Sequence, residues 1–238
     1  VNPGLSQPLL AKRTSPKWMI SALLTTAIVA LPVLSVIFLA FFPEENIWPH
    51  LIETTLPRYL TTTLKLMIGV GALTLVIGLA SAWAVTMCEF PGRKFFEWAM
   101  LLPFAVPAYV IAYVYTSLLD YAGPVQGALR DLFGWSSAAD YWFPEIRSLE
   151  GATLMIGLVL YPYVYLLARA AFLEQSPSLF AVSRSLGHSA LSTFFRVVLP
   201  IARPAVAVGL SLVLMETLND FGTVDFFAVQ TLTAGLFD

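Results

Sequence analysis

The sequence predicts an all-α membrane protein, a bundle of apolar helices that cross a bilayer several times. Hydrophobic residues make up 58% of the 238 residues and charged residues only 12%, and the mean hydropathy is +0.78. A soluble domain carries about 25% charged residues, so this chain has too few charges to cover a water-facing surface. Its apolar residues are also grouped into stretches long enough for a bilayer, which needs about 20 residues per helix.

The composition excludes several classes of function. The net charge of −2 shows no basic excess, so nucleic acid is not expected as a partner. One cysteine, Cys88, cannot form an internal disulfide, and the two histidines, His50 and His188, are too far apart for a zinc cluster. No metal site and no catalytic constellation are predicted. A Walker A phosphate loop is also missing from the sequence, so no ATP hydrolysis and no cofactor are expected in this chain.

Five membrane spans are predicted, over about residues 18–42, 62–88, 97–119, 151–172 and 202–221. Charged residues are absent from four core stretches, which are Trp18–Phe42, Leu66–Cys88, Trp98–Leu119 and Gly151–Ala168. The first is longer than the apolar region of a signal peptide, about 7–15 residues, so we interpret it as a retained helix. The fifth apolar stretch begins at Pro204 and meets Glu216 before it is long enough to cross. It therefore either fails to span or carries a carboxylate inside the membrane.

The distribution of basic residues predicts that the N-terminus is cytoplasmic, because cytoplasmic loops carry an excess of lysine and arginine. With five spans, nine basic residues fall inside, three fall outside, and Lys65 stands at the mouth of the second span. The inside residues are Lys12, Arg13, Lys17, Arg93, Lys94, Arg169, Arg184, Arg196 and Arg203, and the outside residues are Arg58, Arg130 and Arg147. This alternation also supports the fifth span.

Small residues and prolines give the spans their expected shape. Gly78 and Ala82 in the second span form a small-xxx-small pair, typical of close helix packing. Pro103 and Pro107 in the third span each remove a helix hydrogen bond and predict a kink. The kink is either a purely structural bend or the wall of a translocation pathway.

An amphipathic segment is predicted outside the membrane, between the third and fourth spans. It runs from Val125 to Trp135, just after Gly123-Pro124, and we expect it to lie along the membrane surface. Aromatic residues nearby are suitable interfacial anchors; they are Trp135, Tyr141 and Trp142.

The loop over residues 174–200 is the most informative part of the chain. Ser176-Pro177 is a typical N-cap and first-turn pair, and Gly187 is placed as a C-cap glycine. Between them, Leu179, Val182 and Leu186 share one helical face. A second short segment, Ala190–Val198, is predicted to end at Leu199-Pro200. A protruding helix with an apolar face requires a partner.

This loop resembles the coupling loop of ABC importer permeases, E-A-A-x-x-x-G-x9-I-x-L-P. Gly187 matches the motif glycine and nine residues separate it from Val197, after which Leu199 and Pro200 match the terminal Leu-Pro. The departure lies at the start, where Ala181, Val182 and Ser183 replace Glu-Ala-Ala. The resemblance implies that Leu179, Leu186 and the motif residues dock on an ATPase subunit that holds the ATP. Without the glutamate, its polar contact with the ATPase subunit is not expected here, whereas the docking itself still is.

Two further segments resemble ferric-iron permeases of the same class. They are Phe90-Pro-Gly-Arg93 with Leu101–Tyr115, and Met215–Phe227. The resemblance implies a type I ABC importer permease of the bacterial inner membrane. It also implies a pair of ATPase subunits, a periplasmic substrate-binding protein and a second permease half as partners. Such permeases typically hold two six-helix halves, so we interpret this five-span chain as a fragment covering most of the first half.

A polar stripe is predicted on the fifth span. Glu216, Asn219, Asp220 and Thr223 follow a spacing of i, i+3, i+4 and i+7, and two carboxylates on one face repel each other. A water-filled pathway, a basic partner, protonation or a passing cation would each compensate, and so would a structural pair satisfied by other helices. Ferric iron is a hard cation suited to carboxylate oxygens, so transient contact at Glu216 and Asp220 is expected.

Alternative functions remain open at this point. Within the ABC class, the alternative cargoes are thiamine, a polyamine or an oxyanion, and an anion fits poorly beside Glu216 and Asp220. A secondary transporter, which needs no ATPase, is the alternative from another class. The coupling loop favours the ABC importer.

Overall fold

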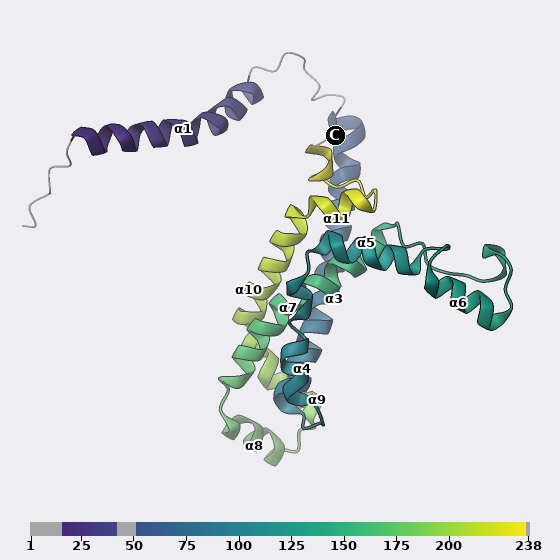
Figure 1. Ribbon diagram of the computed structural model, residues 1–238. Helices are drawn as coiled ribbons and strands as arrows, with labels where there is room; N and C mark the ends of the chain where they lie inside the picture. Colours follow the sequence, from purple (N-terminus) through teal and green to yellow (C-terminus); the bar gives the residue numbers. More distant parts are fainter. Residues whose placement is uncertain (1–15, 42–50, 237–238) are drawn as a thin grey trace, which may run out of the picture. The chain divides into compact units, whose positions relative to one another are not determined.

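The computed structural model describes residues 16–41 and 51–236, and within them every regular element is helical (Figure 1). The chain divides into two compact units, residues 1–51 and 52–238, and each is described by itself. Four residues named in the sequence analysis lie outside the described ranges: Lys12 and Arg13 of the basic N-terminal segment, Phe42 at the end of the first predicted span, and His50.

The first unit contains one long apolar helix, α1 (Pro16–Phe41). Its hydroxyl side chains bond within the helix: Ser21 donates to the carbonyl of Trp18 over 2.9 Å and Ser35 donates to Leu31 over 2.8 Å. A helix that satisfies its own polar groups suits an apolar surrounding. It is one of four described helices that are long and apolar enough to cross a membrane.

Three long helices form the core of the second unit: α3 (Leu56–Met87), α7 (Leu149–Leu173) and α10 (Leu199–Asn219) (Figure 1). Glycine allows their close approach. A Cβ atom on Gly78 would stand 2.8 Å from Cβ of Val164, and one on Gly209 would stand 3.1 Å from Cα of the same valine. The small-residue pair Gly78/Ala82 is therefore confirmed as a packing surface of α3 against α7.

The segment expected as a third span is not one continuous helix. It consists of α4 (Arg93–Ala99), the 3-10 turn η2 (Leu102–Ala105) and α5 (Ala108–Leu119). Val106 is extended, at φ −124° and ψ 128°, because the ring of Pro107 disfavours a helical conformation in the residue before it. The two parts, Arg93–Ala105 and Ala108–Phe133, meet at 96°. The predicted kink is confirmed, and it is a full break rather than a bend.

The segment between α5 and α7 forms a short helix and a turn. Helix α6 (Pro124–Phe133) has Gly123 as its N-cap and Gly134 as its C-cap. The 3-10 turn η3 (Ala138–Asp140) then returns the chain so that the rings of Trp135 and Tyr141 stack, with centroids 4.7 Å apart. Of the three predicted anchors, only Trp142 is strongly exposed, at 86%.

Shorter elements lie at both ends of the three-helix core of the second unit. A π-helical turn η1 (Leu51–Thr55) precedes α3, and α11 (Phe221–Phe226) and the turn η5 (Ala234–Leu236) follow α10. The amide of Leu232 donates to the hydroxyl of Thr63 over 3.0 Å, which fastens the last segment to the start of α3. At the other end of the core lie α4, the short helices α8 (Pro177–Ser185) and α9 (Ala190–Thr193), and the beginning of α10 (Figure 1).

Candidate functional site

The helical hairpin of α8 and α9 contains the residues predicted for coupling. Ser176 caps α8 by accepting a hydrogen bond from the amide of Ser178, and Pro177 occupies the first turn. Gly187 ends the helix at φ +81°. Its amide donates to Arg184 over 2.9 Å and the amide of His188 donates to Ser183 over 3.1 Å, which is the Schellman arrangement. The predicted caps at both ends of this helix are confirmed.

The apolar face of α8 is exposed. Leu179, Val182 and Leu186 have 37%, 57% and 70% of their surface accessible, and Ala181 beside them is also exposed. Ser183, the third of the positions that replace Glu-Ala-Ala, behaves differently, because it is buried and points toward α9. Its hydroxyl lies 2.7 Å from the hydroxyl of Thr193. The hairpin thus presents one apolar surface outward and closes one hydroxyl pair inside.

The second segment of the hairpin does not end at Leu199-Pro200 as predicted. A π-helical stretch η4 (Phe194–Val198) follows α9 and runs directly into α10, so residues 190–219 form one continuous helical stretch of 30 residues. Pro200 stands in the first turn of α10, directly after the π-helical stretch η4, and it donates no backbone hydrogen bond to the preceding turn. Pro204 leaves the carbonyl of Pro200 without its helical donor, and Arg203 Nε donates to that carbonyl over 3.1 Å.

Aromatic contacts fix the base of the hairpin to the core. The ring of Phe194 lies 4.8 Å from Trp83 of α3 and 6.1 Å from Phe172 of α7, in edge-to-face arrangements. Gln175 adds a polar contact by donating from Nε2 to the carbonyl of Val198 over 3.0 Å. Of the remaining predicted loop residues, Val197 and Leu199 are partly buried here and Pro200 is exposed.

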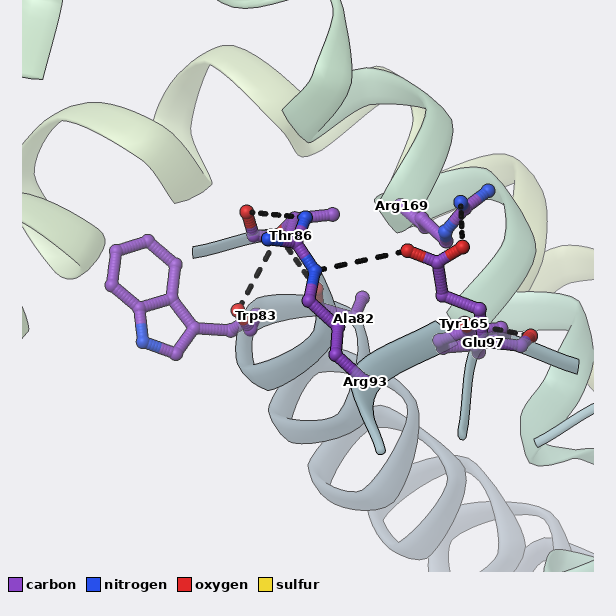
Figure 2. A network of polar contacts seen from close by, with 7 residues as sticks. All are labelled: Ala82, Trp83, Thr86, Arg93, Glu97, Tyr165 and Arg169. Atoms are coloured by element: carbon purple, nitrogen blue, oxygen red, sulfur yellow. Dashed lines mark hydrogen bonds and ion pairs between the residues drawn. The ribbon is translucent and has the colours of Figure 1, made fainter. Parts of the chain in front are cut away.

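A polar network near the same end was not predicted (Figure 2). The carboxylate of Glu97 lies 3.7 Å from Nε of Arg93 and 3.4 Å from Nη2 of Arg169, and its backbone carbonyl accepts from the hydroxyl of Tyr165 over 3.2 Å. Arg93 also donates to the carbonyl of Thr86 over 3.3 Å. The sequence signal was an acidic residue four positions after Arg93 in a basic segment. The network ties α4 to α3 and α7, and the side chains of its ion pairs are about one-third exposed.

A cavity of about 320 Å³ lies at the opposite end of α10, and it gathers most of the predicted pathway residues. Glu216, Asn219 and Asp220 line it together with residues of the broken segment and of α7. The other lining residues are Phe104, Val106, Pro107, Ala108, Tyr109, Val159, Leu160 and Tyr163. Pro107 is therefore in the wall of the cavity, whereas Pro103 lies in η2 and is not among the lining residues.

The polar stripe predicted for the fifth span is wrong as a continuous helical face. Helix α10 ends at Asn219, and Asp220 adopts φ −76° and ψ 91°. The Oδ1 atom of Asp220 accepts a hydrogen bond from the amide of Thr223 over 2.8 Å, so this residue is the N-cap of α11. Asp220 breaks the helix because a short acidic side chain favours capping over a place inside a helix. Thr223 is fully buried and does not line the cavity.

The polar side chains in the described wall of the cavity are acidic or neutral. Two carboxylates and one amide lie among aromatic and aliphatic side chains, and no lysine or arginine is among the described residues of the wall. Within residues 16–41 and 51–236, no group of three or more His, Cys, Asp or Glu side chains is placed to hold a metal ion. Two carboxylates alone provide too few ligands for a tight metal site.

Comparisons with known proteins relate the chain to transport permeases. Over 149 residues, or 63% of this chain, the sequence is 30% identical to a probable sulfate transport system permease protein of Chlorella vulgaris, of which it covers 53%. Over 187 residues, or 79% of the chain, it is 27% identical to an Fe(3+)-transport system permease protein of Haemophilus influenzae, of which it covers 32%. Over 153 residues, or 64% of the chain, it is 27% identical to a molybdenum transport system permease protein of Escherichia coli, of which it covers 63%.

The alignment with the family spans most of the second unit. The chain covers about a third to two-thirds of the length of the relatives named above. Residues 74–235, which include the hairpin and the cavity residues, match the family described as binding-protein-dependent transport system inner membrane component. The apolar helices and this match make the chain a multi-pass membrane protein with the helical bundle of a type I ABC importer permease. The chain belongs to the family of binding-protein-dependent transport system inner membrane components.

Proposed function

We propose that this chain is a membrane-spanning permease subunit of an ATP-driven importer, and that α8 is its docking helix for a separate ATPase subunit. The observation that carries the proposal is the exposed apolar face of α8 on a hairpin capped at both ends. An exposed apolar surface of this kind marks an interaction site. In this proposal ATP binds only to a pair of partner ATPase subunits, a substrate-binding protein delivers the cargo, and a second permease half completes the pathway.

The proposal places the α8 end of the core in the cytoplasm of a bacterial cell, with the N-terminus on the same side of the inner membrane. Basic residues support this orientation. The elements at the α8 end contain Arg93, Lys94, Arg169, Arg184 and Arg196. The binding protein then docks at the side where α6 and α11 lie.

We propose ferric iron as the cargo, on the strength of the cavity. Two carboxylates in a wall without lysine or arginine attract a cation and repel an anion, and the low dielectric constant of the membrane interior strengthens both effects. A weak site also suits transport, because a tightly bound ion would not leave. An oxyanion is the second candidate, because permeases named for sulfate and molybdenum match this chain at identities similar to that of the Fe(3+) permease.

Uptake by the full-length permease tests both the coupling and the cargo. The permease, its ATPase and its binding protein are reconstituted in vesicles, and uptake of ferric iron, sulfate, molybdate, thiamine and a polyamine is measured with and without ATP. We expect ATP-dependent uptake of iron alone. Uptake that follows an ion gradient without ATP would instead indicate a secondary transporter.

The variants Glu216→Gln and Asp220→Asn isolate the role of the cavity. They remove charge and keep shape, so together they should lower iron uptake roughly tenfold while the amount of protein in the membrane is unchanged. Glu150→Gln is a matched control, because Glu150 is exposed at the start of α7 and does not line this cavity. If the double variant instead takes up more sulfate or molybdate than the wild type, the cargo would be an oxyanion.

A further inference from the structure

One hydrogen bond joins the two helices of the hairpin through their side chains. Ser183 of α8 and Thr193 of α9 are each 3% exposed, and their hydroxyl oxygens are 2.7 Å apart. Among the described residues, no other side-chain hydrogen bond connects α8 to another helix. The turn between the helices contacts α9 through His188, whose Nδ1 lies 3.3 Å from the hydroxyl of Ser192, whereas the space around Gly187 is open.

The two sides of this hydroxyl pair are held very differently. On the α9 side, Phe194 is packed against Trp83 and Phe172, and the carbonyl of Val198 accepts from Gln175. On the α8 side, Ser183 is the only described side chain classed as buried. The α9 side is therefore a fixed base, whereas α8 is held more loosely, by the partly buried ring of Phe180 against the core and by the hydroxyl pair as its polar attachment to α9.

The fixed base is continuous with the far cavity. Residues 190–219 form one helical stretch of 30 residues, which spans about 45 Å at 1.5 Å per residue. Glu216 and Asn219 of its last turn line the cavity, and Asp220 follows directly. A displacement of α9 therefore has a continuous helical route to the cavity, whereas a displacement of α8 reaches that route through Ser183 and Thr193.

We infer that Ser183 and Thr193 are positioning residues that pass the movement of α8 into this long helix. The inference rests on the proposed function, because it assumes that an ATPase moves α8. Each hydroxyl satisfies the other in a buried place, so removal of one leaves the other without a partner. Helix α8 then keeps its exposed face and its docking partner, but it loses its fixed position relative to α9.

The test measures the amount of cargo transported per ATP hydrolysed by the full-length complex. Ser183→Ala and Thr193→Val should each lower this ratio roughly fivefold, because an unpaired buried hydroxyl shifts the balance between attached and detached positions by about that factor. ATP hydrolysis itself should continue. The double variant should be no worse than either single variant, since all three lack the same bond.

Two controls separate positioning from general damage. Ser185→Ala removes an exposed hydroxyl that bonds only within α8, to the carbonyl of Val182, and should leave the ratio unchanged. Thr193→Ser keeps a hydroxyl and should retain coupling. If Ser183→Ala lowers the amount of protein in the membrane, the pair Thr193→Ser and Thr193→Val decides alone, since Thr193→Val keeps the volume of the side chain.

The measured ratios distinguish a failure of this inference from a failure of the proposed function. A wild-type complex without ATP-driven transport would overturn the proposed function and this inference together. A coupled wild type with unchanged ratios in Ser183→Ala and Thr193→Val would overturn the inference alone. Additive losses in the double variant, or equal losses in Ser185→Ala, would likewise show that the hydroxyl pair is not the attachment.

Discussion

The hairpin around Gly187 and the cavity around Glu216 lie at opposite ends of the same helical stretch, and they are built in different ways. The hairpin is made of neighbours in sequence: Ser176, Gly187 and Thr193 define it within 20 residues. The cavity is made of three segments, residues 104–109, 159–163 and 216–220, that meet only in the fold. One region is therefore a local structure that presents a surface, and the other is a half-open cavity formed by packing.

The difference teaches how each region responds to substitution. A local structure depends on backbone conformations that single residues set, so a change at one cap alters the whole hairpin and little else. The shape of the cavity depends on many side chains, so the charge of one side chain in its wall can be removed with little change of shape. The predictions below use this contrast, beginning with the largest expected effect.

The two regions should be accessible from opposite sides of the membrane. In a Cys88→Ser background, which removes the single native thiol, Ser189→Cys and Asp225→Cys place one exposed thiol at each end. In intact spheroplasts an impermeant thiol reagent should label Asp225→Cys and leave Ser189→Cys unlabelled until the membrane is opened. The expected effect is all-or-none. Labelling of both sites from outside would refute the proposed topology and the contrast that depends on it.

Substitution of Gly187 should disable the hairpin without affecting the cavity. Valine strongly disfavours the φ of +81° found here, so Gly187→Val should reorient α8 and reduce ATP-driven uptake at least tenfold. The amount of protein in the membrane should be unchanged, because a side chain at this position meets no atom within 4 Å. Gly187→Asn is the matched control, since asparagine tolerates the left-handed region. Equal uptake in the valine and asparagine variants would mean that the turn does not set coupling.

Substitution of Asp220 should separate its structural role from its charge. Because Asp220 caps α11, Asp220→Ala should lower the free energy of unfolding by about 1 kcal/mol, whereas Asp220→Asn should leave it nearly unchanged. Both variants should lower iron uptake to a similar extent if the charge is what the cargo meets. Thermal stability in detergent and uptake in vesicles are the two measurements. A loss of uptake only in the alanine variant would assign the residue to structure alone.

The sequence predicted the local features of this fold well, for physical reasons that act over a few residues. The caps at Ser176 and Gly187, the kink at Pro107 and the close approach at Gly78 each follow from the backbone or size of a single residue, whereas the full break at this kink was not predicted. The limits of α3, α7 and α10 differ from the predicted spans by a few residues at most ends, because hydropathy marks the apolar core and not the last helical turn.

What only the tertiary structure decided are the contacts between distant segments and the choices between competing local preferences. Asp220 could continue one helix or cap the next, and in the structure its carboxylate accepts from the amide of Thr223 and caps α11. Pro200 could end a segment or begin a helix, and the π-helical stretch before it makes the helix continuous. Helical periodicity placed Ser183 on α8 but could not show that Thr193 lies opposite it.

The sequence by itself determined an apolar helical bundle with one exposed hairpin, because those features depend on composition and on single-residue conformations. The cavity and the hydroxyl pair needed the fold, because each is a juxtaposition of groups whose sequence separation carries no record of their contact.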